Sequence, residues 1–380
     1  MRKRLFQVIT VILATSITLL LLEFGVRIIA PQSLVATQSD IAWRTDDTFG
    51  WNHQANVNTQ INLAAAEVAF ATDAYGYRIN STPVHYPENA KNVLVLGDSF
   101  LEAAQVENEE STVEVLRLAL EKEGISSRFY NTAVSGWDPN HYFLAAKQAL
   151  EEHQLTIDYG LVFLYIGNDI INEIKNRYQP KKKFKTHHFH IPKKWNSKGI
   201  KKAFLYPIND FFEQRSHLFI FIKKKNYNLL GKLGLGTYYF PEVFKKDFKD
   251  SENWQTTYEV CRKIRHLFLS KNIPVDFVLI PTSYQVNEEQ FREYQQYFNI
   301  DVNTIALDQP NQILSEKFAT DSVLLLDPLE FFRAEAKQGN RLYGTIDKHF
   351  IPLGHQKMAE YLLPTVQTAL SVRDTTASPN

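Results

Sequence analysis

The hydrophobic pattern of this chain changes once, from a single long apolar run at the N-terminus to short apolar runs separated by polar stretches. No charged residue occurs from Leu5 to Leu22, and such a run is just long enough for a helix to cross the hydrocarbon core of a bilayer. Glu23 and Arg27 interrupt the pattern, and Pro31 ends any helix. We therefore predict one membrane-spanning helix within residues 1–31.

The residues that flank this run indicate its orientation. Met1-Arg2-Lys3-Arg4 precedes it, and a basic end of this kind stays in the cytoplasm while the rest of the chain crosses the membrane. The alternative is a cleaved signal peptide, which has a shorter apolar stretch and an Ala-x-Ala-like cleavage site. Only Ala36, after Leu34-Val35, offers a weak site of that kind. An uncleaved anchor is favoured, with the main domain in the periplasm or outside the cell.

The remainder of the chain predicts an α/β fold. Residues 32–90 are polar and turn-rich, so we expect an irregular lead-in packed on a main domain of residues 91–372, with residues 373–380 as a disordered tail. Within the main domain, short apolar runs alternate with longer stretches of helical spacing. This alternation predicts a three-layer α/β/α fold with a parallel sheet. The expected strands are 92–96, 128–134, 161–166, 274–280 and 322–326, and the expected helices are 110–123, 140–153, 256–269 and 354–370.

Small polar clusters follow the first three of these strands and precede the last helix. Because ligands bind at the carboxyl ends of parallel strands, all four clusters should meet at one edge of the sheet. This convergence is stronger evidence for a site than any single cluster. The clusters are Gly97-Asp98-Ser99-Phe100, Val134-Ser135-Gly136-Trp137, Gly167-Asn168-Asp169 and Asp347-Lys348-His349.

These residue types suit nucleophilic catalysis. A serine hydroxyl needs a base to take its proton and an acidic group to orient that base, which Ser99, His349 and Asp347 could supply. The backbone N–H groups of Ser99 and Gly136, with the side-chain amide of Asn168, could form an oxyanion hole. Considered singly, the same residues have ordinary structural explanations. Ser99 or Asp169 could cap a helix, Asn168 could lie in a turn, and His355 is expected to be structural on the last helix.

The four clusters together resemble the conserved blocks of the GDSL/SGNH hydrolases. The resemblance runs from about Asn92 to the last helix, with a poorly matched stretch at about 175–250. It implies a flavodoxin-like parallel sheet, Ser99 as nucleophile, His349 as base, and Gly136 with Asn168 as oxyanion donors. Asp347 lies two residues before His349, where many members have an acid three residues before the base. This Asp-x-His variant resembles the branch that modifies envelope polysaccharides. Ala103-Ala104 also stands where a glycine is common.

Composition narrows the range of partners. Lys plus Arg equals Asp plus Glu at 42 each, so the net charge does not indicate a polyanionic partner. The predicted extracytoplasmic compartment also argues against nucleic acid as a partner. Cys261 is the single cysteine, which excludes an internal disulfide. No cofactor is expected. His187, His188 and His190 lie in a lysine-rich stretch and are more typical of a solvated surface than of a metal site.

One local charge asymmetry remains, in the insertion at about 175–250. Eleven Lys or Arg residues and no Asp or Glu occur from Lys175 to Lys202, interleaved with aromatic residues such as Phe184, Phe189 and Trp195. A solvated loop explains this run as well as a functional surface does. The functional hypothesis is a rim that attracts an acidic polysaccharide or anionic lipid headgroups.

The leading hypothesis is an extracytoplasmic ester hydrolase or acyltransferase that acts through acyl-Ser99. Its substrate would be O-acyl groups, above all acetyl, on an envelope or exported polysaccharide, with partners that modify that polysaccharide. The first alternative is a lipid esterase or lysophospholipase, favoured by attachment to the membrane through residues 5–22. The second is a non-catalytic scaffold or binding module of a polysaccharide-export complex.

Overall fold

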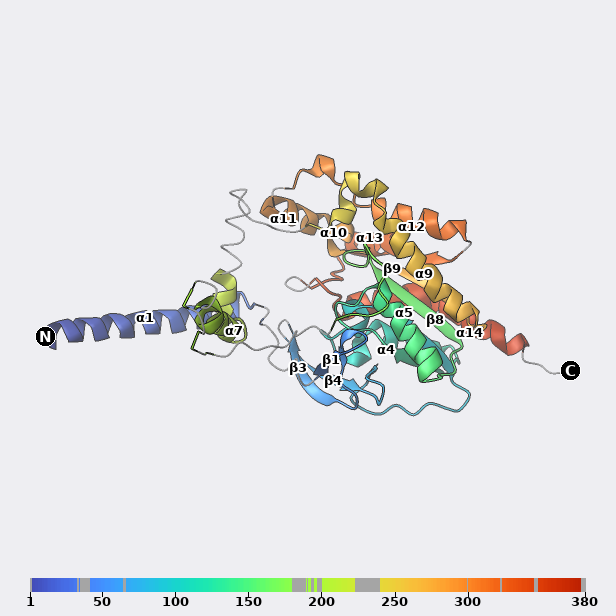
Figure 1. Ribbon diagram of the computed structural model, residues 1–380, viewed down its shortest axis with the longest axis horizontal. Coiled ribbons are helices and arrows are strands. Elements are labelled where there is room, and N and C mark those ends of the chain that lie inside the picture. The colour runs from blue at the N-terminus through green and yellow to red at the C-terminus, as the bar shows by residue number, and fades with distance from the viewer. Residues whose placement is uncertain are drawn as a thin grey trace.

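An eight-stranded sheet lies at the centre of the main domain (Figure 1). The structure is a computed structural model and describes residues 2–32, 34, 42–63, 66–179, 189, 191–192, 195–196, 200–222, 240–298, 300–321, 323–344 and 348–376. The strand order across the sheet is β10-β9-β8-β6-β7-β5-β4-β3. Five of the strands are parallel, namely β6 (Lys91–Leu96), β7 (Ser127–Asn131), β8 (Tyr159–Tyr165), β9 (Val275–Ile280) and β10 (Leu325–Leu326).

Numbered along the chain, the parallel strands have the order 2-1-3-4-5, which is the flavodoxin-like order. Helices cover both faces of the sheet, so the expected three-layer α/β/α fold is confirmed. On one face lie α5 (Pro139–Lys147), α9 (Asn253–Leu269) and α12 (Gln309–Thr320). On the other lie α4 (Thr112–Lys122), α13 (Leu329–Lys337) and α14 (Pro352–Thr376).

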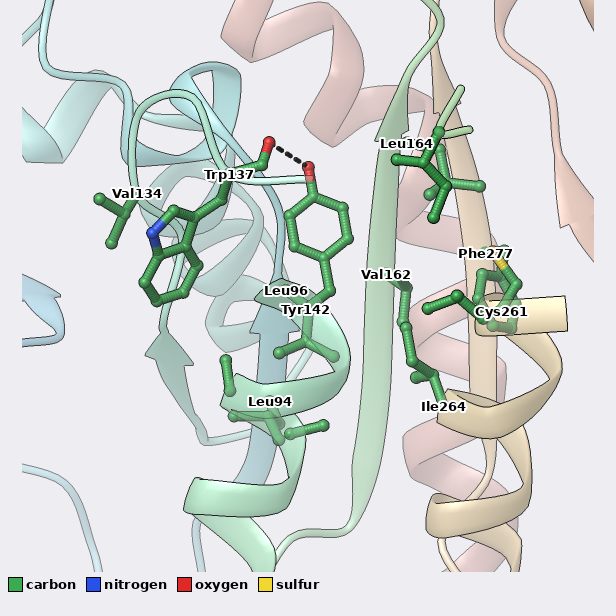
Figure 2. Close-up of a cluster of buried hydrophobic side chains, with 14 of the residues drawn as sticks. Leu94, Leu96, Val134, Trp137, Tyr142, Val162, Leu164, Cys261, Ile264 and Phe277 are labelled. Carbon is green, nitrogen blue, oxygen red and sulfur yellow. Dashed lines mark hydrogen bonds between the residues drawn. The ribbon is translucent and has the colours of Figure 1, made fainter. Parts of the chain in front are cut away.

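The alternation of side chains along β6 separates two hydrophobic cores. Leu94 and Leu96 point to one face, where they join residues of α5 and α9 (Figure 2). Val93 and Val95 point to the other face, against α4 and α14. All four side chains are fully buried, as expected for a strand covered on both faces. Cys261 of α9 is a free, fully buried thiol and packs as a small hydrophobic residue.

The lead-in is not irregular, and this expectation was wrong. A hairpin of β1 (Trp43–Asp46) and β2 (Gly50–His53) packs on the domain. Next, β3 (Asn58–Leu63), β4 (Ala66–Thr72) and β5 (Arg78–Ile79) extend the main sheet in the antiparallel sense, with β5 pairing to β7. Pairing with an existing sheet edge stabilises these strands, so they can form with little periodicity of their own.

The last helix, the N-terminal helix and four shorter helices add to the described structure. Helix α14 continues to Thr376, so part of the expected tail at 373–380 is helical, because no Pro or Gly interrupts residues 365–376. At the other end, α1 (Arg2–Ile29) is long and apolar enough to cross a membrane. Its most apolar stretch of 18 residues has a mean hydropathy of 2.4, and none of the residues of α1 is buried. The shorter helices are α3 (Ser99–Glu102), α7 (Tyr206–Glu213), α10 (Ser283–Val286) and α11 (Glu288–Phe298).

Candidate active site

The candidate site lies where the strand order of the sheet reverses. β6 and β8 are adjacent and parallel, and the chain leaves β6 toward β7 on one side and β8 toward β9 on the other. In an open α/β sheet, such a switch point leaves a crevice beyond the carboxyl ends of the two strands. Ser99 begins α3 directly after β6, and Asn168 follows β8. The topology therefore brings two of the four clusters to this crevice.

His349 lies directly beside Ser99, although 250 residues separate them in sequence. Its Nε2 atom is 2.7 Å from Ser99 Oγ, and both residues are half-buried. The His349 ring also packs on Phe100, with 4.8 Å between the ring centroids. This is the geometry expected of a nucleophile and its base.

The loop that carries His349 is held at both ends. Tyr343 and Phe350 form an antiparallel bridge, and the backbone N–H of Gly344 donates to the carbonyl of His349 at 2.9 Å. At the start of α14, a Cβ atom on Gly354 would lie only 2.2 Å from the carbonyl oxygen of Leu342. Glycine is therefore required there for the last helix to approach the loop.

Asp98 connects the serine to Asn168. Its carboxylate caps α3 by accepting from the Phe100 N–H at 3.0 Å, and it also accepts from Asn168 Nδ2 at 3.3 Å. Complete burial raises the pKa of Asp98, and this effect is only partly offset by the Phe100 N–H, the nearby His349 and Asn168. Asn168 itself is exposed, so its amide lies at the rim of the crevice. The hydrogen bond to the buried Asp98 orients this amide.

Gly136 lies in the turn that follows β7, the strand beside β6. It has a φ of 75°, in the region that favours glycine, and it is exposed. The last residue of β7 and the turn itself are each connected to α3. Asn131 Nδ2 donates to the carbonyl of Leu101 at 2.8 Å, and Ser135 Oγ donates to the Glu102 carboxylate. The turn and the helix that begins with Ser99 are thus joined by buried polar contacts.

Glu102 is the centre of a buried polar network that the sequence did not reveal. Its carboxylate is completely buried and accepts from His53 Nε2 at 2.7 Å, from Trp43 Nε1 at 2.8 Å and from the hydroxyl of Ser135. Burial opposes its ionisation, but these hydrogen bonds and the His53 charge outweigh burial and lower the pKa of Glu102 to about 2. The other ring nitrogen of His53 faces the carbonyl of Gly76 at 3.0 Å. Both ring nitrogens of His53 therefore face oxygen atoms.

Two further residues of the lead-in reach the same region. The buried Arg78 guanidinium donates to the carbonyls of Glu102 and of Val106, the latter at 2.7 Å. Burial lowers the pKa of Arg78 to about 10, which leaves it charged near neutral pH. Trp51 Nε1 donates to the carbonyl of Ser135 at 2.8 Å. Side chains from β1, β2 and β5 thus support both α3 and the turn that contains Gly136.

Two residues with expected structural roles can also be placed. His355 lies on α14, fully buried, with Nδ1 2.9 Å from Thr112 Oγ1, and burial lowers its pKa to about 3. Its structural role is confirmed. Asp169 does not cap a helix but accepts from the Tyr142 hydroxyl and the Tyr165 N–H, each at 2.8 Å. Burial and the charge of Asp98 raise its pKa well above the ordinary range.

Some of the candidate residues lie outside the described part of the chain. These are Asp347, the expected orienting acid, and His187, His188 and His190, the weak metal candidates. Most of the basic run from Lys175 to Lys202 is also outside it. The pair of Ser99 and His349, and the contact of Asn168 with Asp98, do not involve these residues.

No family model and no curated protein sequence matches this chain. Solved structures show a distant similarity. A member of the lipolytic protein G-D-S-L family from Veillonella parvula DSM 2008 has 13% identity and a TM-score of 0.38, over 72% of this chain and 97% of that chain. The acetyl xylan esterase AlAXEase has 14% identity and a TM-score of 0.39, over 72% and 99%. A catalytic mutant of Axe2, an acetylxylan esterase from Geobacillus stearothermophilus, has 13% identity and a TM-score of 0.37, over 74% of this chain and 96% of that chain.

At these TM-scores the similarity adds nothing to what the chain's own topology shows. The flavodoxin-like strand order and the 2.7 Å contact between Ser99 and His349 at its switch point come from this chain alone.

Proposed function

We propose that this protein is a membrane-anchored, extracytoplasmic serine ester hydrolase or acyltransferase that acts through an acyl-Ser99 intermediate. Its substrates would be O-acyl groups, chiefly acetyl, on an envelope or exported polysaccharide. The observation that carries this proposal is the 2.7 Å contact between Ser99 Oγ and His349 Nε2 at the switch point of the sheet. A serine hydroxyl in contact with an imidazole in such a crevice is the minimal apparatus for acyl transfer.

In the first half of the reaction, His349 Nε2 takes the proton of Ser99 as Oγ attacks the carbonyl carbon of the ester. The tetrahedral intermediate then collapses. The alcohol leaves with the proton from His349, and the acyl group stays on Ser99. In the second half, His349 takes a proton from water or from an acceptor hydroxyl, whose oxygen attacks the acyl carbon. Hydrolysis and acyl transfer therefore differ only in which hydroxyl reaches the acyl-enzyme.

The negative charge of the tetrahedral intermediate needs hydrogen-bond donors. We assign this role to the backbone N–H groups of Ser99 and Gly136 and to the side-chain amide of Asn168. Asn168 has two amide protons, and the contact with Asp98 uses one of them, which leaves the other for the substrate. Asp98 would therefore act as a positioning residue for Asn168, and Asp347 would orient the His349 ring. Removal of one such donor typically lowers kcat by roughly 10²–10³-fold.

The choice of a polysaccharide substrate rests on two features of the chain. An apolar N-terminal helix preceded by three basic residues favours placement of the main domain outside the cytoplasm. In addition, Gly136 and Asn168 are both exposed, so the proposed oxyanion donors lie at an open rim. An open rim accepts an acyl group on a bulky carrier, whereas a long acyl chain needs an enclosed apolar channel.

The proposal is tested with the purified full chain in detergent and p-nitrophenyl acetate. Ser99→Ala and His349→Ala should each lower kcat/KM by several orders of magnitude, up to roughly a millionfold. The matched controls are Ser270→Ala and His266→Ala, two exposed residues at the end of α9 that should leave turnover unchanged. Full activity in the Ser99→Ala variant would overturn the proposal.

The same assay separates the alternatives. A preference for p-nitrophenyl palmitate over the acetate would favour a lipid esterase, the candidate supported by the membrane-spanning helix. Release of acetate from an acetylated polysaccharide, or acetyl transfer to an added polysaccharide, would decide between hydrolase and transferase. No turnover of any ester by the wild-type chain would favour the non-catalytic scaffold.

A further inference from the structure

An apolar stripe is exposed on the helical segment 200–213, part of the insertion in the main domain, which Figure 1 shows beside α1 and apart from the central sheet. The segment consists of a turn at Lys201–Leu205 that continues directly into α7. The side chains of its stripe are between 37% and 51% exposed. They recur at spacings of three and four residues, which places them on one side of a helix. The members are Phe204, Leu205, Ile208, Phe211 and Phe212.

In a soluble domain, a stripe with this spacing is the side that a helix buries. Here the burial is reversed, since the buried residues of the segment include Ala203 and Pro207, whereas the large apolar side chains face outward. The stripe is the largest concentration of exposed aromatic residues among the described residues beyond α1. Such a surface requires an apolar partner.

The position of this segment is set by the end of α1. The carboxylate of Glu23 accepts from the hydroxyl of Ser216 at 2.7 Å and from the backbone N–H groups of His217 and Leu218, each at 2.9 Å. It thereby caps the helix that begins at residue 217, directly after α7. Figure 1 shows α7 beside the end of α1 that is farthest from the N-terminus.

Two further hydrogen bonds fix the same junction. The Arg27 guanidinium donates to the carbonyl of Arg215 at 3.2 Å, and the backbone N–H of Gln32 donates to His217 Nδ1 at 2.8 Å. An ion pair between Arg27 and Glu23, at 3.3 Å, adds to the junction. These contacts join the apolar helix to segment 200–222 through charged and polar groups of both.

The length of the apolar run gives the height of this junction relative to a bilayer. From Leu5 to Leu22 the helix rises about 27 Å, close to the thickness of a hydrocarbon core. With α1 spanning the bilayer, which is part of the proposed function and on which this inference rests, Glu23 lies at the boundary between hydrocarbon and headgroups. A helix attached there, with one apolar side and exposed aromatic rings, has the character of an interfacial membrane helix.

We infer that residues 200–222 form a membrane-docking element that lies in the headgroup region of the bilayer, held against the end of α1 by Glu23. Its ligand is the lipid surface itself, and the apolar stripe is the side that enters it. The element would make this part of the chain a fixed support at the membrane, from which the main domain extends.

The inference is tested by spin labels on the full chain in phosphatidylcholine nanodiscs, in a Cys261→Ala background. Single cysteines are introduced from 204 to 213, omitting Pro207, and the accessibility of each label to oxygen and to a water-soluble nickel chelate is measured. The ratio of oxygen to nickel accessibility should oscillate with the helical period. Its maxima, several-fold above the minima, should occur at 204, 205, 208, 211 and 212.

The matched control is a label at Glu316→Cys, an exposed position on α12 of the main domain, which should give a water-like ratio. A ratio at residue 211 equal to that at residue 316 would overturn the inference. So would low accessibility of the stripe to both reagents, because that result shows protein, such as a second copy, covering it. Turnover of p-nitrophenyl acetate, which does not depend on the stripe, reports whether each labelled chain is folded.

Discussion

The main domain around the central sheet and segment 200–222 differ in where their apolar side chains lie. In the main domain, large side chains such as Phe277 and Phe318 are completely or almost completely buried, and the two cores cover both faces of the sheet. In segment 200–222, Leu205 and Phe211 are about half exposed. The main domain therefore supplies its own apolar environment, whereas the apolar side chains of segment 200–222 are left exposed by the described part of the chain.

A comparison of two glutamates makes the same distinction for polar groups. Glu102 is fully buried and bonded to three side chains, which connect the lead-in, α3 and the turn at Gly136. Glu23 is bonded to one hydroxyl and two backbone N–H groups at the end of an apolar helix. The first glutamate joins three elements inside the protein, and the second attaches one exposed segment to another.

The largest effect on stability should come from Glu102→Ala. This change leaves His53, Ser135 and Trp43 without their buried partner, and removal of one member of a buried ion pair costs about 3–5 kcal/mol. Urea unfolding of the main domain measures the loss. Glu316→Ala, on the exposed side of α12, should change the free energy of unfolding by less than about 0.5 kcal/mol. Equal effects of the two changes would contradict the buried network.

The same substitution at two phenylalanines compares the two regions directly. Phe277→Ala should cost about 3 kcal/mol or more, because it leaves a cavity in a core where the side chain is fully buried. Phe211→Ala should change the free energy of unfolding in detergent by less than about 0.5 kcal/mol, since its side chain is already exposed. A large loss from Phe211→Ala would mean that the stripe packs on protein.

Acid should weaken the main domain through Glu102. Its pKa is 4.5 in the unfolded chain and about 2 when folded, so its contribution to stability is complete above pH 4.5. That contribution decreases as pH falls and is lost below about pH 2. Urea unfolding at several pH values should therefore show a steeper loss in the wild type than in Glu102→Gln, which has no carboxyl to titrate. If the free energy of unfolding fell with pH equally in the wild type and in Glu102→Gln, the lowered pKa of Glu102 would be contradicted.

A smaller and local effect than that of Glu102→Ala or Phe277→Ala should come from Glu23→Leu. Loss of a helix cap costs about 1 kcal/mol, which corresponds to roughly fivefold faster amide exchange where exchange reports local opening. Hydrogen-exchange mass spectrometry should detect this at the amides of His217 and Leu218, with the main domain unchanged. Unchanged exchange at both amides would show that Glu23 does not hold the element.

The sequence alone was sufficient to predict the fold of the main domain and the pairing of Ser99 with His349. Runs such as 92–96 are apolar throughout because both faces of the sheet are covered, and that pattern is visible without a structure. The carboxyl ends of parallel strands then meet at one edge, so residues 250 positions apart could be placed together.

The lead-in and its contribution to the site could not be predicted in this way. Glu102 and His53 are 49 residues apart, and each taken alone has the pattern of an ordinary surface residue. Their partnership depends on where the hairpin of β1 and β2, which is separate from the main sheet, packs against α3, and no local periodicity reveals that packing. The signal that was available is Arg78 and Trp51 in a segment otherwise rich in turns, but one sequence gives no means to tell a buried arginine from an exposed one.

The most direct test of the central claim is covalent labelling of the full chain with a fluorophosphonate, followed by peptide mass spectrometry. A reagent of this kind reacts only with a serine whose hydroxyl is activated by a base. We predict one adduct, on Ser99, that is absent in Ser99→Ala and forms at least a hundredfold more slowly in His349→Ala. Ester turnover by a chain that carries no adduct on Ser99 would contradict the assignment.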